Sequence, residues 1–182
     1  LPNAHTAILS FYTTADVTHI FILTHDSTQI HTCPGQGWSN FQQWLKASWL
    51  TAYIDDSSTW RTQIARSLTE LAHRLDLDAL IGKLTDITEL ILIPHLYLHQ
   101  IPFAALPIFR SQEGLGAGSG YLGDRFTIRY APSCQILKYC TDRPPIDSPQ
   151  YGTIEDADGT LPGAGFEGDQ IAELYQILPQ YR

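Results

Sequence analysis

The chain has 182 residues, of which 43% are hydrophobic and 16% are charged, the composition of a globular protein with one well-buried core. Its formal net charge of -8 argues against a nucleic-acid-binding surface, because Lys and Arg never cluster beyond isolated pairs. No apolar run approaches the ~20 residues of a membrane span and no signal peptide precedes the first apolar segment, so we expect no membrane association and a cytoplasmic location.

The N-terminal third predicts a small group of strands. Two β-rich runs, 6–13 and 18–24, are separated by a short polar turn over 14–17, which indicates an antiparallel hairpin. A further turn at 26–28 leads to a third short strand around Ile30.

Two helices are expected next. Ser39 is a candidate N-cap for the first, which carries Phe41, Leu45 and Trp49 on one face. A break at 55–58 offers good N-cap residues for the second. The second helix places apolar residues at spacings of four, four, three and four, namely Trp60, Ile64, Leu68, Leu71 and Leu75. Such a regular stripe is typical of a helix that faces the core.

The segment 89–106, ELILIPHLYLHQIPFAAL, is the most informative part of the sequence. Its opening apolar run lacks polar alternation, which favours a strand covered on both faces, as in a parallel α/β sheet. Sites in such sheets form after the carboxyl end of a strand, and Pro94, His95 and His99 lie there. Imidazole titrates near neutral pH, so either His could act as a general acid or base. Alternatively, both hydrogen-bond backbone groups in a turn held by Pro94 and Pro102.

The segments that follow alternate between loops and short elements. A Gly- and Ser-rich stretch over 111–123 leads to a strand at 126–130, and a helix opens at Pro132 or Ser133. The stretch 141–150 has three prolines and no apolar periodicity, which makes it the clearest linker.

Beyond this linker we expect a short strand at 151–154, an acidic turn at 155–159 and an amphipathic helix over 167–181. The sequence contains no methionine, and its final helix has no later segment to pack against. Both observations suggest a piece of a longer protein.

Two patterns of possible chemistry lack the context that they need. Residues 118–123 match GxGxxG, but a strand follows them instead of a helix, so we predict a flexible loop and no nucleotide site. The three cysteines are odd in number and include no CxxC pair, which favours reduced thiols and argues against a metal site. We expect no cofactor.

A cysteine thiol could also act as a nucleophile. Cys134 begins a predicted helix, where the helix dipole favours a thiolate, whereas Cys140 lies near the other end of that helix. Cys33 follows Thr32 in a Pro-Gly turn, a position compatible with exposure. No strand-Cys-Gly or strand-His-Gly turn occurs, which argues against a complete Cys–His dyad.

Several runs of the sequence, taken in order, carry a family resemblance. The run 92–106 is similar to the signature hydrophobic-PHGxLHxxPFxAL, and YLGDRF at 121–126, YAPS at 130–133 and LPGA at 161–164 are similar to later blocks of the same family. The chain therefore resembles the CHAT domain, a caspase- and separase-like module often found after TPR repeats, notably in cyanobacteria. The signature positions that match are Pro94, His95, His99, Pro102 and Phe103.

The resemblance implies an α/β fold: a three-layer caspase-like sandwich with a mainly parallel central sheet plus an N-terminal antiparallel hairpin. Leu96 departs from the signature, which usually has Gly there, so we expect a bulkier loop. Family members resemble clan CD cysteine endopeptidases (hydrolases), whose catalytic His and Cys lie in later blocks that these residues do not contain. We therefore expect no catalytic residue in this chain, and a structural or supporting role for the signature.

The resemblance also implies that the chain contains two parts with different roles. Residues 1–140 would form a non-catalytic, pseudo-caspase-like part, and residues 151–182 would begin a truncated catalytic subdomain. The expected function is to scaffold or regulate the catalytic half that carries the Cys–His dyad. Expected partners are that half, on the same or a separate chain, and TPR repeats or a protein substrate. Two alternatives remain open: a non-enzymatic interaction or signalling module, and an independent enzyme that uses His95 and His99.

Overall fold

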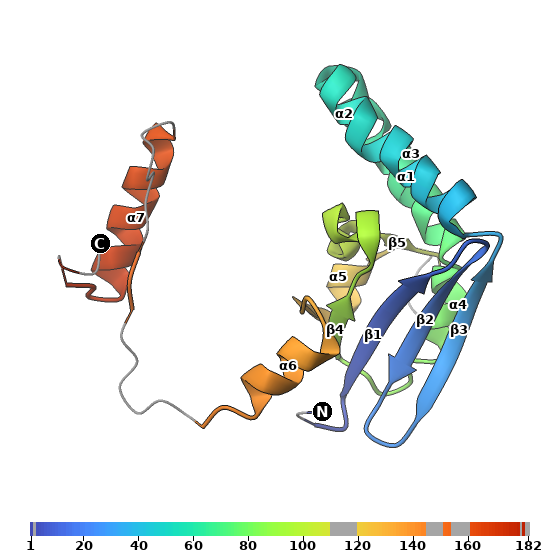
Figure 1. Cartoon of the computed structure of the whole chain (residues 1–182), viewed down its shortest axis with the longest axis horizontal. Helices are drawn as coiled ribbons and strands as arrows, with labels where there is room; N and C mark the ends of the chain where they lie inside the picture. The colour runs from blue at the N-terminus through green and yellow to red at the C-terminus, as the bar shows by residue number, and fades with distance from the viewer. Residues whose placement is uncertain (2, 110–119, 145–150, 154–160, 179, 181–182) are drawn as a thin grey trace. The chain divides into compact units, whose positions relative to one another are not determined.

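The computed structural model describes residues 1, 3–109, 120–144, 151–153, 161–178 and 180. The chain forms two compact units, Leu1–Thr141 and Asp142–Arg182 (Figure 1). Within the described ranges, no helix combines the length and the apolar character that crossing a membrane requires.

A five-stranded sheet with the strand order β3-β2-β1-β4-β7 forms the centre of the first unit. Strands β1 (Thr6–Thr13), β2 (Val17–Leu23) and β3 (Thr28–Pro34) pair antiparallel. Strands β4 (Glu89–Ile93) and β7 (Thr127–Tyr130) extend the sheet with parallel pairs, β1 to β4 and β4 to β7. The predicted α/β class and the N-terminal antiparallel hairpin are confirmed.

Strand β4 lies between two apolar clusters. Leu90 and Leu92 join the main core on one face of the sheet, whereas Ile91 and Ile93 join a smaller cluster on the other face. Side chains alternate between the faces of a strand, so an unbroken apolar run is what a strand covered on both sides needs. The prediction from this run is confirmed.

The connection from β3 to β4 consists of helices that pack on the main core. Four consecutive helical segments form its first part, which we call the first helical segment: η1 (Trp38–Gln42), α1 (Gln43–Leu45), η2 (Lys46–Thr51) and α2 (Ala52–Asp55). Helices α3 (Ser57–Arg74) and α4 (Leu77–Gly82) follow it. Figure 1 shows α2 and α3 extending beyond the sheet.

The first helical segment begins earlier than predicted, because Gly37 and not Ser39 is its N-cap. The backbone N–H of Trp38 donates to the carbonyl oxygen of Thr14 at 2.9 Å, which anchors the helix start on the β1–β2 turn. A Cβ at Gly37 would overlap the backbone of Ala15 and Asp16. This tertiary contact, which local sequence does not encode, sets the boundary.

Helix α3 confirms the prediction made from its apolar stripe. The carboxylate of Asp56, in the predicted break, accepts the backbone N–H groups of Ser58 and Thr59 at 3.0 and 3.1 Å. A hydrogen bond from the Thr59 hydroxyl, and then these backbone bonds, hold the pKa of Asp56 below its ordinary value. The buried residues of the helix are Leu68, Leu71 and Ala72.

Short elements connect β4 to β7. They are η3 (Leu96–Gln100), η4 (Phe103–Ala105), β5 (Pro107–Ile108), β6 (Gly120–Tyr121) and α5 (Leu122–Arg125). Strands β5 and β6 pair antiparallel. Most of the stretch predicted as a loop lies outside the described residues, but its end, from Gly120 on, forms β6 and the start of α5 rather than a loop.

Helix α6 (Cys134–Thr141) supplies the layer on the second face of the sheet. Its Leu137 packs against the smaller apolar cluster. The Ser133 hydroxyl accepts the backbone N–H of Ile136 at 3.1 Å, which confirms the predicted helix start. With the main core on one face and α6 on the other, the first unit has three layers.

The second unit contains α7 (Pro162–Leu174), which begins earlier and ends sooner than the predicted 167–181. Proline fits the first turn of a helix because the backbone N–H that it lacks would have no partner there, and the prediction overlooked this signal. Residues 151–153 form no strand, contrary to prediction. Most of the predicted linker and all of the predicted acidic turn lie outside the described residues.

Candidate functional site

The signature residues lie at the carboxyl end of β4, where the chain turns into η3. Pro94 is buried beneath this turn, His95 is half-buried, and His99 is exposed at the end of η3. Pro102 is exposed and Phe103 is buried. The two histidines therefore occupy different environments, and their roles separate accordingly.

His95 is attached to the end of β1. Its Nδ1 atom accepts the backbone N–H of Thr13 at 3.1 Å, so the ring proton of the neutral form resides on Nε2. The imidazole also stacks on the ring of Tyr12, with centroids 5.4 Å apart. Burial, and then the nearby charge of His99, lower the pKa of His95. This histidine is a neutral hydrogen-bond acceptor at neutral pH.

The buried side chain of Gln42 makes a second attachment between the loop and β1. Its Oε1 atom accepts the backbone N–H of Tyr97 at 3.1 Å, and its Nε2 atom donates to the Thr13 hydroxyl at 3.3 Å. Since the Thr18 hydroxyl donates its proton to the carbonyl oxygen of Gln36, the Thr13 hydroxyl must donate to Thr18, 3.0 Å away. The result is a one-directional chain of hydrogen bonds in which every buried group has a partner.

Sequence reasoning did not single out Gln42, Thr13 or Thr18 for this network. All three are buried, with exposed fractions of 0%, 8% and 0%. A polar residue directly after the core residue Phe41 was the available signal, but only the fold brings Gln42 to the loop.

Leu96 lies between the two attachments in the left-handed conformation, with φ of 56°. This conformation costs an L-residue with a Cβ roughly 1–2 kcal/mol and costs glycine almost nothing. The glycine of the signature is thereby explained. Leu96 accepts this cost while 41% of the residue is exposed, so the expected bulk of the loop projects into solvent.

Phe103 joins the end of the signature to β7. Its backbone N–H donates to the phenol oxygen of Tyr130 at 3.2 Å, and its ring packs 5.2 Å from that of Phe11. Burial raises the pKa of Tyr130 above its ordinary value, although the bond from Phe103 acts in the opposite direction. Phe103 is therefore a packing residue at the carboxyl edge of the sheet.

The YLGDRF block, residues 121–126, packs against the end of the signature at Ala104 and Leu106. The Asp124 carboxylate accepts the backbone N–H of Tyr121 at 2.8 Å, and the backbone N–H of Leu122 donates to the carbonyl oxygen of Leu106 at 2.9 Å. A Cβ at Gly123 would lie 3.0 Å from the Cβ and carbonyl oxygen of Ala104. The Gly and Asp of this block thus have structural roles.

Large side chains remain exposed around the loop 94–103, which we call the signature loop. The exposed fractions are 53% for Tyr12, 43% for Trp38 and 53% for Tyr130, and the Trp38 ring stacks on Tyr97 at 6.5 Å. We call these four residues, with Leu96, the aromatic rim. Aromatic residues that stay exposed at the edge of a fold are typical of contact surfaces.

The thiols do not join this site. Cys33 is buried at the end of β3, not exposed in a turn, and donates to the carbonyl oxygen of Leu75 at 3.4 Å. Burial raises the pKa of its thiol to about 12. Cys134 and Cys140 are exposed on α6. Within the part of the chain that the structure describes, no hydrogen bond connects a thiol to a histidine.

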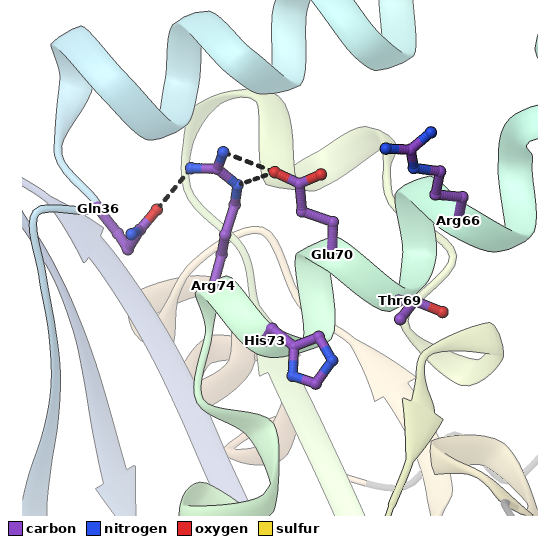
Figure 2. Close-up of a pocket in the computed structure, with 6 residues that line it drawn as sticks. All are labelled: Gln36, Arg66, Thr69, Glu70, His73 and Arg74. Carbon is purple, nitrogen blue, oxygen red and sulfur yellow. Dashed lines mark hydrogen bonds and ion pairs between the residues drawn. The ribbon is translucent and has the colours of Figure 1, made fainter.

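A shallow polar hollow on α3 is a second candidate site (Figure 2). The Arg74 guanidinium donates to Glu70 at 2.7 and 3.0 Å and to Gln36 at 3.0 Å, and it lies over the Trp44 ring. The Thr69 hydroxyl donates to a carbonyl of its own helix. These side chains form an ion-paired surface, and no hydrogen bond joins the Thr69 hydroxyl to His73, the histidine of this hollow.

Among the described residues, no three His, Cys, Asp or Glu side chains are grouped so that they could share a metal ion. The comparisons with known proteins point to one family. Residues 62–177, well over half of the chain, match the family model of the CHAT domain. No curated protein matches the chain.

Proposed function

Because the chain belongs to the CHAT domain family, which is caspase-like, we propose that it is the N-terminal, non-catalytic portion of a cysteine endopeptidase. In this proposal, the Leu1–Thr141 unit scaffolds or regulates a catalytic half that carries the Cys–His dyad, on the same or a separate chain. The Asp142–Arg182 unit begins that half. The three reduced cysteines support a cytoplasmic setting.

One observation supports this proposal above the others. The half-buried signature histidine, His95, uses Nδ1 to accept the backbone N–H of Thr13, and in the described residues no thiol forms a hydrogen bond with it. A general base needs its acceptor nitrogen free for a nucleophile. This bond supports a structural role for the signature at the carboxyl edge of the sheet, which is the role that we propose.

The direct test is an assay of this chain alone and together with the catalytic half of its parent protein. We expect no cleavage of peptide substrates by the chain alone, and thiol-dependent cleavage when the other half is present. Cleavage by the chain alone that is abolished by Cys134→Ala and retained in Cys140→Ala would overturn the proposal, because both thiols are exposed on the same helix.

The aromatic rim is equally consistent with a second candidate, a non-enzymatic interaction module. A scaffold and an interaction module both need a contact surface, so the rim alone does not separate them. The parent sequence after Arg182 does: a module without a proteolytic counterpart lacks both the later His block and the later Cys block. TPR repeats or a protein substrate are the proposed partners of such a module.

A further inference from the structure

Two attachments of different chemistry hold the signature loop, and both end on Thr13. The first joins His95 Nδ1 to the backbone N–H of Thr13, beyond the last β1–β4 pair, which is Ser10 with Ile93. There the imidazole takes the place of a neighbouring strand's carbonyl group. The second runs from the backbone N–H of Tyr97 through Gln42 to the Thr13 hydroxyl. Only the first contains a titratable group.

We propose that the contact between His95 and Thr13 is a pH-sensitive latch, which holds the signature loop to β1 when the imidazole is neutral and releases it when the imidazole is protonated. Protonation places a hydrogen on Nδ1, so an N–H then faces the N–H of Thr13. Two donors cannot form a hydrogen bond, and Thr13 is buried. The loop must move for either group to find another partner.

The surroundings of the ring determine when the latch opens. Tyr12 of β1 stacks on the imidazole, and His99 of the same loop is the charged neighbour that acts on it. Among the described residues, no carboxylate contributes to the pKa of His95. Burial and His99 both disfavour the charged form, so the latch is closed at neutral pH and opens below the ordinary histidine value of about 6.5.

The opening is confined to one side of the loop. The bonds of Gln42 do not titrate in this range, so Tyr97 stays tethered while His95 leaves. Leu96, between the two anchors, is in a strained left-handed conformation. Release of His95 allows Leu96 to relax, and this strain favours the open form.

The test is an NMR titration of the Leu1–Arg182 chain from pH 8 to pH 5, with amide protection factors corrected for intrinsic exchange. We expect the protection of the Thr13 amide to fall by about tenfold or more with the same midpoint as the His95 ring signals. Tyr97 should keep its protection through this transition. Constant protection of Thr13, or a parallel loss at Thr13 and Tyr97, would overturn the latch.

Two variants isolate the histidine. His95→Asn places a non-titrating acceptor near the Thr13 amide, so Thr13 should stay protected across the pH range. His99→Gln removes the neighbouring charge, so the midpoint should shift to higher pH while the latch is kept. An unchanged pH dependence in His95→Asn contradicts the proposal. If that variant does not fold, the wild-type titration and His99→Gln decide.

Discussion

The side-chain oxygen of Gln42 accepts the backbone N–H of Tyr97 at 3.1 Å, across 55 residues of sequence. This bond fixes which end of the amide faces the loop, because an N–H group needs an oxygen opposite it. The amide nitrogen must then point to Thr13, and the whole chain of buried hydrogen bonds follows from that orientation.

Replacing Gln42 with leucine keeps the approximate volume and removes both bonds. The Tyr97 amide loses its partner, so we expect a loss of about 1–3 kcal/mol in the free energy of unfolding. Urea denaturation measures this loss. Gln43→Leu is the matched control, because Gln43 is exposed, and it should change stability little. Equal effects of the two substitutions would contradict the role of the network.

The strain at Leu96 predicts that glycine is better tolerated there than alanine. Both substitutions remove the exposed side chain, but only alanine keeps the Cβ that the left-handed conformation disfavours. We expect Leu96→Gly to be about 1 kcal/mol more stable than Leu96→Ala by thermal or urea unfolding. If alanine is the more stable of the two, Leu96 is not strained in solution.

The close approach of Gly37 to the β1–β2 turn predicts strong intolerance to a side chain. A Cβ would overlap the backbone of Asp16, which cannot move without disturbing the hairpin, so Gly37→Ala should cost about 3 kcal/mol. Gly120→Ala provides the control, since its Cβ would meet only ordinary contacts at 3.8 Å. Similar melting temperatures for the two variants would refute the contact.

The burial of Cys33 predicts the stoichiometry of thiol modification. At pH 8 the native protein should react rapidly with a thiol reagent at Cys134 and Cys140, whereas Cys33, with its raised pKa and 3% exposure, should react only after unfolding. Mass spectrometry before and after denaturation counts the labels. Rapid native labelling of Cys33 would show that the β3 edge opens readily.

His31 predicts a loss of stability in mild acid. Burial, and then Lys83, lower the pKa of His31 in the folded state below the value of about 6.5 expected when it is unfolded. Its contribution to stability is therefore complete above pH 6.5 and is lost as the pH falls from there toward the folded value. Urea midpoints at pH 7.5 and 5.5 should differ less in His31→Gln than in the wild type. His25→Gln is the control, because His25 is exposed, and its two urea midpoints should differ as much as those of the wild type.

The elements that could be predicted are those whose pattern is local. The stripe of α3 and the unbroken apolar run of β4 each determine an element because a helix or strand face must be buried as a unit. Gln42 shows the limit: a glutamine that is followed by a second glutamine, Gln43, is normally assigned to the surface. Only the packing of η1 against the hairpin converts it into the partner of Tyr97. The signature could be located from sequence, but the bonds of His95 depend on Thr13, 82 residues away.

Alternate side chains of β4 belong to two different apolar clusters, so the strand cannot gain or lose a residue without exchanging the two sets. Deleting one residue would send Leu90 and Leu92 toward α6 and the isoleucines toward the main core, while drawing Pro94 and His95 back by one strand position. Thr13 would then lose its bond to His95, and Gln42 would lose its bond to Tyr97. Length variation is therefore expected to be far less tolerated in β4 than changes of apolar side chain.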